Sequence, residues 1–162
     1  MLKYLIVSIL IFCVLASSRF IPHPPNFTSL IALSFYVPVF LGSRYLPALL
    51  LSFAITDFII GYHTGTHWTW GSIFLIGLIA PIFAKNIKSR ICGALSGALI
   101  FFVITNFGVW ASGMYETSID GIILCYSLAI PFFTYSLIST LMFSVILEII
   151  YSFKYKFFAK LN

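Results

Sequence analysis

Asp57 has the most distinctive chemical setting in this sequence. Its carboxylate lies inside the apolar stretch from Tyr45 to Tyr62, close to the end of that stretch. An ionisable group in a membrane-spanning segment is costly, so a functional role is the first hypothesis for it. We expect Asp57 to contact a ligand or to take part in a proton-linked step. The alternative is structural, with Asp57 paired to Arg19 or capping a neighbouring backbone group.

A second set of candidates lies in the segment from Arg19 to Thr28, which separates two apolar stretches. Three prolines in this segment forbid a regular helix. Polar side chains come from Arg19, His23 and Asn26. We expect an ordered loop that holds these three over a cavity. Arg19 either reaches the headgroup level, pairs with Asp57 or binds an anionic group of the ligand.

His63 and His67 are four residues apart, so they would share one face of a helix. With His23 or Asp57 they could form a site for zinc, nickel or cobalt. Glycines around them favour a loop, where this spacing means little. Hydrogen-bonded loop histidines are therefore favoured over a metal site, and His63 is kept as a candidate ligand contact.

The third set of candidates, Asn106, Trp110 and Tyr115, belongs to the end of the fifth apolar stretch. An amide about one turn inside a span needs a hydrogen-bond partner in the bundle or on a ligand. Trp110 could stack on a planar ligand. Together with Trp68, Trp70 and Tyr115 it also fits an aromatic belt at the membrane surface, which is the favoured interpretation.

The composition places all these residues in a membrane protein. The chain is 61% hydrophobic and 8% charged, whereas soluble domains carry about 25% charged residues. We expect one transmembrane domain over residues 1–162, built from helices because backbone groups in lipid must be bonded internally. The basic residues form no single face, which excludes a nucleic-acid binder. The three cysteines lack the spacing of a zinc site or a disulfide framework.

Six transmembrane helices account for the apolar stretches. We place them at 2–18, 28–41, 45–62, 70–84 and 91–111, with the last within 119–153. The first stretch also fits a signal peptide, but we expect it to be retained as a span. Residues 119–153 exceed one span of about 20 residues, and Pro131 divides them. We expect a short extra helix, Gly121 to Ile130, in the last outer loop before the sixth span; two spans are the alternative.

The distribution of basic residues predicts the orientation. With six spans and both termini in the cytoplasm, eight of the nine basic residues lie at the inner face. These are Lys3, Arg44, Lys85, Lys88, Arg90, Lys154, Lys156 and Lys160. Arg19 alone falls outside, together with the candidate residues described above. We therefore expect a multi-pass protein of the bacterial inner membrane whose outer half carries the polar chemistry.

Two further patterns bear on function and packing. The sequence has no nucleophile with a plausible base, no phosphate-binding glycine loop and no pair of close carboxylates. We therefore expect neither an enzyme nor a bound cofactor. Gly93-x-x-x-Gly97 predicts close helix packing within the chain, with dimerisation as a second use.

Several strings resemble a family of small bacterial membrane proteins without an assigned activity. They are Pro22-His23-Pro24-Pro25-Asn26-Phe27-Thr28, Asp57 ahead of Gly61, Asn106-Phe107-Gly108-Val109-Trp110, Met114-Tyr115 and the segment Gly121 to Phe133. That family is more distantly similar to the S components of energy-coupling factor transporters. The resemblance implies six helices, a pocket built from the first, third and fifth outer loops, and a transmembrane partner with two ATPases.

The leading functional hypothesis is a substrate-binding membrane protein for uptake of a micronutrient or another small solute. Its candidate contacts are Arg19, His23, Asn26, Asp57, His63, Asn106, Trp110 and Tyr115. The alternative is a structural accessory subunit of a larger membrane complex. In that case aromatic residues such as Phe35, Phe40, Phe101 and Phe102 would be bare and would face a protein partner.

Overall fold

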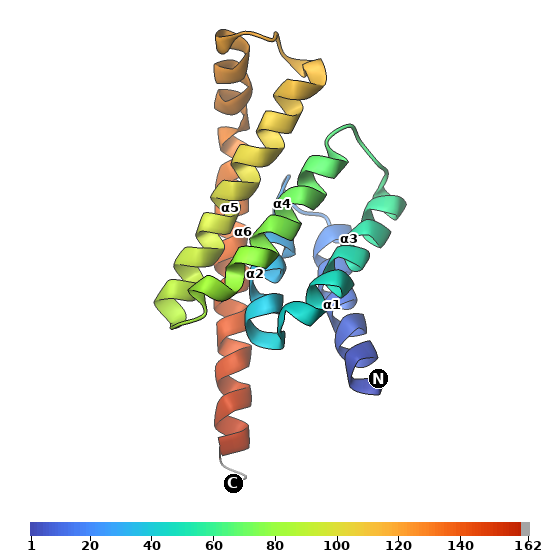
Figure 1. The fold of residues 1–162 in the computed structure, drawn as a ribbon, viewed down its shortest axis with the longest axis vertical. Coiled ribbons are helices and arrows are strands. Elements are labelled where there is room, and N and C mark those ends of the chain that lie inside the picture. Colours follow the sequence, from blue (N-terminus) through green and yellow to red (C-terminus); the bar gives the residue numbers. More distant parts are fainter. Residues whose placement is uncertain (160–162) are drawn as a thin grey trace.

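The computed structural model describes the backbone of residues 1–159 and the side chains to Phe153. Within that range the chain is all-helical and contains no strand. Six α-helices follow one another along the chain (Figure 1): α1 Leu2–Phe20, α2 Leu30–Leu41, α3 Leu46–Ile60, α4 Thr66–Ile79, α5 Ile87–Val109 and α6 Ile119–Ala159. Short helical turns at Ser43–Tyr45, Ala80–Phe83 and Trp110–Met114 connect several of them.

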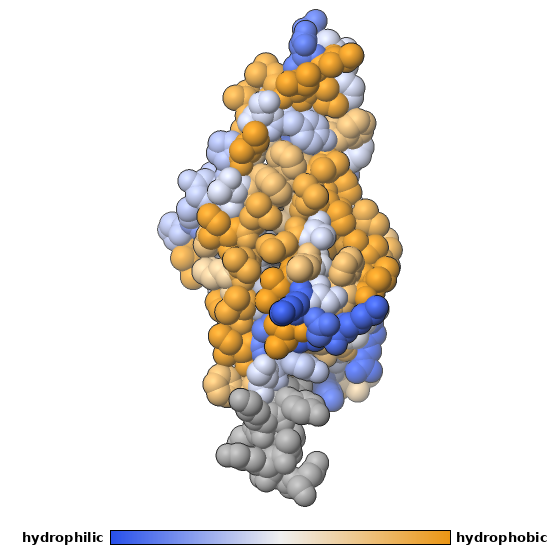
Figure 2. All heavy atoms as spheres, turned by 90° about the vertical axis from the view of Figure 1, so that its left-hand side faces the viewer, coloured by the Kyte–Doolittle hydropathy of each residue, from blue (hydrophilic) through white to orange (hydrophobic). Residues whose placement is uncertain are grey.

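The helices have the character of membrane spans. Five helical segments are long and apolar enough to cross a membrane, and α2 is a shorter apolar helix. Burial differs from that of a soluble protein, because many large apolar side chains such as Leu51 and Phe58 are exposed, while hydroxyl groups such as Ser34 and Ser72 are buried within an apolar core. Figure 2 shows an apolar surface over most of one face, with hydrophilic residues gathered in a lower band and at the upper tip. The prediction of an all-helical fold is confirmed for the described residues, and five of its helical segments could cross a membrane, as expected of a membrane protein.

Helix α2 forms the centre of the molecule. Every residue from Leu30 to Pro38 is buried, and α3, α4, α5 and α6 all contact this helix. Its residues are almost uniformly apolar, which suits a helix covered on all sides. Phe35 is therefore in the core and not on a bare surface, and Phe40 and Phe102 stack on Tyr151 and Phe133. Bare aromatic surfaces were expected only for the accessory role; that expectation is wrong for Phe35, while Phe40, Phe101 and Phe102 are half-buried.

Small residues allow the close approach of α5 to the centre. A Cβ atom at Gly93 would lie 2.6 Å from the Phe35 ring of α2, and one at Gly97 would lie 3.1 Å from Ile76 of α4. A Cβ at Gly108 would overlap the ring of Trp68. The prediction that Gly93 and Gly97 pack helices within the chain is confirmed.

The last helix differs from its prediction. Gly121 to Ile130 is not a separate short helix, because α6 continues through Pro131 as one helix of 41 residues. The Thr134 hydroxyl donates to the carbonyl of Ile130, the residue before the proline, at 3.1 Å. Pro131 has no amide to bond the Ser127 carbonyl one turn earlier, but the helix continues on both sides of it, as membrane helices that contain proline can.

The predicted inner segments lie toward one end of the molecule. The N-terminus, the turn at Ser43–Tyr45, the α4–α5 connection and the C-terminal part of α6 are at the lower end of Figure 1. Tyr4 of α1 and Tyr45 stack with ring centroids 4.9 Å apart, which ties the start of α1 to that turn. The side chains of Lys154, Lys156 and Lys160 lie outside the described residues.

Candidate functional site

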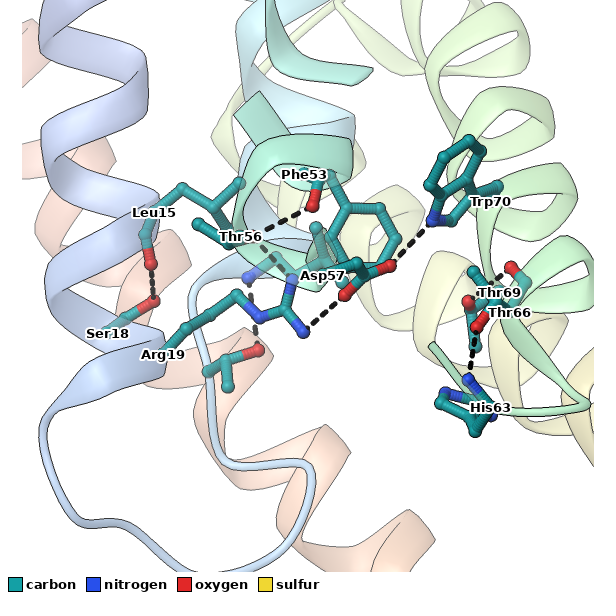
Figure 3. A network of polar contacts seen from close by, with 12 residues as sticks. Leu15, Ser18, Arg19, Phe53, Thr56, Asp57, His63, Thr66, Thr69 and Trp70 are labelled. Atoms are coloured by element: carbon teal, nitrogen blue, oxygen red, sulfur yellow. Dashed lines mark hydrogen bonds and ion pairs between the residues drawn. The ribbon is translucent and has the colours of Figure 1, made fainter. Parts of the chain in front are cut away.

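A buried ion pair between α1 and α3 forms the centre of the candidate site. Arg19 Nη2 lies 2.6 Å from Asp57 Oδ1, and the two side chains are 14% and 7% exposed. The second carboxylate oxygen accepts a hydrogen bond of 2.6 Å from Trp70 Nε1 of α4. Figure 3 shows these three helices converging on Asp57. The carboxylate is therefore held by a charge on one side and a neutral donor on the other.

Local sequence explains why Arg19 reaches this position. It lies in the last turn of α1, where a cation is favourable to the helix dipole. Its guanidinium carbon is 4.6 Å from the ring centroid of Phe53, a cation–π contact. Phe53 precedes Asp57 by one helical turn, so both share one face of α3. Arg19 also donates through Nη1 to the Thr56 hydroxyl, which itself donates to the Phe53 carbonyl at 2.8 Å.

The ion pair lines a partly enclosed cavity of about 280 Å³. Five of the eight predicted contacts lie on its wall: Arg19, His23, Asn26, Asp57 and His63. Polar groups from Thr28 and Thr69 and the rings of Phe53 and Phe101 complete much of the remaining wall. The chain thus brings together residues from the loop after α1, from α3 and from the loop after α3.

The proline-containing loop has a defined conformation. The Phe27 amide donates to the Pro24 carbonyl at 3.0 Å, and the Thr28 amide donates to the Asn26 carbonyl at 3.1 Å. Asn26 has a positive φ of 62°, a conformation that Asn tolerates better than most residues. His23 places its two ring nitrogens 2.7 and 3.3 Å from the carbonyls of Pro24 and Arg19. The expectation of an ordered loop over a cavity agrees with this geometry.

His63 begins the turn that leads into α4. Its Nδ1 accepts a hydrogen bond from the Gly65 amide at 3.1 Å, and its own amide donates to the Thr66 hydroxyl at 3.0 Å. His67 lies instead beside Trp68, with ring centroids 5.4 Å apart. Among the described residues no three His, Cys, Asp or Glu side chains are placed to hold a metal ion.

The remaining three candidates lie elsewhere. Asn106 donates its side-chain amide to the Phe102 carbonyl of its own helix at 2.7 Å. Trp110 Nε1 donates to the Glu116 carbonyl at 3.1 Å, within the turn between α5 and α6. Neither these residues nor Tyr115 lines the cavity. The residue of α5 that lines the cavity is Phe101.

Sequence reasoning missed two features. Trp70 was assigned to an aromatic belt, because its position three residues after His67 gave no sign of its bond to Asp57. The second feature is another buried ion pair, in which Arg90 Nε and Nη2 donate to the two oxygens of Glu148 at 2.6 and 2.7 Å. Glu148 is the only acid in the second half of α6, which was the available signal.

The second ion pair lies between α5 and α6, near the opposite end of the molecule. Its side chains are 12% and 7% exposed. The Arg90 guanidinium also lies over Phe40, 5.3 Å from the ring centroid, and Phe40 stacks on Tyr151 at 4.0 Å. The two oxygens of Glu148 face the two nitrogens of one arginine, which is the bidentate geometry of a strong pair.

Comparison with known proteins gives a family and no function. No curated protein and no solved structure matches the chain closely enough to count as a relative. One family model, described as a family of unknown function, matches residues 1–161. This agrees with the resemblance to small membrane proteins without an assigned activity. The chain therefore belongs to this family, DUF6580.

Proposed function

We propose that this protein binds a small polar solute in the cavity beside Arg19 and Asp57 and serves its uptake across the bacterial inner membrane. The observation that carries the proposal is the cavity itself. Five candidate residues from distant parts of the chain meet on its wall, and two of them form a buried ion pair. Perturbed or buried charges in a concave site are a common mark of a binding site.

The wall indicates the chemical class of the solute. The carboxylate of Asp57 already has a cation and an indole donor as partners, so the pair presents little net charge. An imidazole from His63 and an amide from Asn26 add neutral hydrogen-bonding groups, and Phe53 and Phe101 add aromatic surface. A volume near 280 Å³ lies at the small end of ligand pockets. The best match is a small neutral or zwitterionic molecule with a flat apolar part.

Basic residues support an orientation with both termini in the cytoplasm. Lys3, Arg44 and the cluster from Lys85 to Arg90 belong to the segments at one end of the molecule, and the cavity belongs to the loops of the other. Under the positive-inside rule the cavity then faces outward. The sequence contains no nucleotide-binding motif, so energised uptake requires partner proteins, as in the transporters with S components.

Binding by purified protein tests the proposal. The full-length chain in nanodiscs would be screened against small polar micronutrients by native mass spectrometry and thermal shift. Asn26→Ala should weaken binding at least tenfold, because Asn26 lines the cavity. Asn106→Ala is the matched control, since it removes the same amide outside the cavity and should leave the affinity unchanged. Loss of binding in Asn106→Ala alone would move the site to the end of α5.

A structural accessory role is the second candidate. The observation that favours it is the tip of the α5–α6 hairpin, which extends beyond the other helices in Figure 1 and exposes Met114 and Ile119 at 69% and 77%. Purification from native membranes in mild detergent distinguishes the two roles. A stoichiometric complex without ATPases that is lost in Met114→Asp would support the accessory role.

A further inference from the structure

One face of α6 carries a column of buried polar side chains. Ser136, Thr140, Ser144 and Glu148 follow at intervals of four residues, and each is at most 5% exposed. Residues four apart lie on the same face of a helix. Hydroxyls in membrane helices normally bond to their own backbone, and Ser136 does so, donating to the Phe132 carbonyl at 3.1 Å.

Two hydroxyls of this column, and one on α2, do not follow that pattern. Tyr36 of α2, Thr140 and Ser144 are buried, and within the described residues their hydroxyl oxygens have no hydrogen-bond partner. The Tyr36 hydroxyl faces Ser144 and Glu148 at close range, so a direct hydrogen bond to one of them is the alternative to a bridging ligand. A buried hydroxyl without a partner costs about 1–3 kcal/mol. Three of them on two contacting helices indicate a common ligand that supplies the missing bonds.

We propose that Tyr36, Thr140 and Ser144 bind internal water between α2 and α6, next to the carboxylate of Glu148. Water fits because each hydroxyl can both donate and accept, and because a buried water needs two to four polar partners. The Arg90 guanidinium neutralises Glu148, so the site lacks the negative charge that would select a cation. Exposures of 0–1% for the three residues leave no access for a lipid headgroup.

The water site extends a line of polar groups that begins at the outer cavity. Ser139, one residue before Thr140, donates to the Asn26 carbonyl at 3.5 Å, and Asn26 lines the cavity. The face of α6 that meets α2 thus carries polar groups from near the cavity wall to the inner ion pair, within an otherwise apolar contact.

Thermal unfolding of the full-length protein in nanodiscs tests for the water without any solute. Tyr36→Phe, Thr140→Val and Ser144→Ala each remove one hydroxyl. If water is bound, each variant lowers the unfolding midpoint by about 2–4 °C, the shift expected per kcal/mol for a chain of this length. The pair Tyr36→Phe with Ser144→Ala should lose less than the sum, because both groups bind the same water. Unchanged or raised midpoints in all three variants would show a dry interface and overturn the proposal.

Two controls complete the experiment. Ser34→Ala removes a buried hydroxyl of α2 that already donates to the Ile31 carbonyl at 2.7 Å, so it should change the midpoint less than Ser144→Ala. An equal loss would mean that lost volume, not lost water, is measured. Radiolytic labelling should oxidise Tyr36 but spare its buried neighbour Phe35. Stabilisation of the wild type by NaCl over choline chloride, absent in Ser144→Ala, would identify a cation and also overturn the proposal.

Discussion

The two buried ion pairs of this protein are built differently. Besides contacting each other, Arg19 contacts Thr56 and Phe53, and Asp57 accepts a hydrogen bond from Trp70. Both residues line a cavity whose wall includes further polar groups. In the second pair, Arg90 gives two nitrogens to both oxygens of Glu148. The carboxylate of the first pair accepts from two helices other than its own, whereas that of the second is bonded by Arg90 of α5; Arg90 also lies over Phe40 of α2 and donates through Nη1 to the Ala84 carbonyl at 3.4 Å.

The outer pair is therefore suited to ligand binding, whereas the inner pair is suited to holding helices together. A bidentate pair with both oxygens satisfied by one partner has little capacity left for a ligand. In the outer pair the carboxylate also accepts from the neutral Trp70 indole and the guanidinium also donates to the neutral Thr56 hydroxyl, so a solute can replace one neutral partner without breaking the ion pair. Breaking a buried pair by removing one partner is strongly destabilising, because the remaining charge stays buried. The two pairs should therefore respond differently to the same kind of substitution.

The largest effect is expected at the inner pair. Glu148→Ala leaves the Arg90 guanidinium buried without its carboxylate, and we expect a loss of about 3–5 kcal/mol in the free energy of unfolding. Denaturant unfolding of the protein in detergent micelles measures it. The double variant Arg90→Met with Glu148→Met should recover most of the loss, because no charge then remains. A loss below about 1 kcal/mol in Glu148→Ala would show that the pair is solvated.

A smaller loss of stability is expected at the outer pair. Asp57→Asn keeps the size of the side chain but removes the charge opposite Arg19, with a cost of about 1.5–3 kcal/mol for a hydrogen bond to a charged group. Water in the cavity can solvate the guanidinium, which limits the loss. The same variant should abolish solute binding, measured by thermal shift. Unchanged binding in Asp57→Asn would show that the carboxylate does not contribute to the site. The two pairs would then not differ in function.

Trp70→Phe tests the neutral donor of the outer pair. The substitution keeps an aromatic ring of smaller size but removes the hydrogen bond from Nε1 to the Asp57 carboxylate, and we expect about 1.5–2 kcal/mol less stability. Tyr151→Phe is a control beside the inner pair, since it keeps the stack on Phe40 and should be nearly neutral. Solute affinity should change in Trp70→Phe and remain constant in Tyr151→Phe. The reverse result would place the binding function at the inner end.

Thr56→Val should have the smallest effect. It removes the hydroxyl that accepts from Arg19, while the ion pair with Asp57 and the contact with Phe53 remain. A loss of about 0.5–1.5 kcal/mol is expected for one hydrogen bond. Equilibrium unfolding compares it with Asp57→Asn. Equal losses in the two variants would mean that the hydroxyl, and not the carboxylate, holds the guanidinium.

Much of the outer site could be predicted from the sequence. Asp57 and Arg19 stood out because each is a charge in an unfavourable place, and their pairing was one of the stated alternatives. The prolines indicated that the loop with His23 and Asn26 has a fixed shape. Trp70 could not be recognised, because the same residue type at a membrane boundary is explained by an aromatic belt. Its partner is 13 residues away, on another helix.

The fold was predictable in its helices but less so in the contacts between them. Apolar runs marked most of the spans, yet Pro131 was given too much weight as a helix breaker. Asn106 and Trp110 belong to one of the strings that carry the family resemblance, and the sequence placed them correctly near the end of the fifth helix. Their rotation about α5, which turns them away from the cavity, depends on packing such as that of Gly108 against Trp68. Glu148 escaped notice because it lies near lysines at a predicted membrane boundary.

The unbroken length of α6 has a consequence for the surrounding lipid. Its apolar part, Ile119–Phe153, has 35 residues and corresponds to about 52 Å at 1.5 Å per residue, whereas a hydrocarbon core is about 30 Å thick. Helix α3, with 15 residues, is only about 22 Å long. The bilayer must therefore match a tall side and a short side of one small protein, by thinning, thickening or tilt. We expect its thermal stability in vesicles to pass through a maximum as acyl chains are lengthened, with the optimum set by this uneven hydrophobic height.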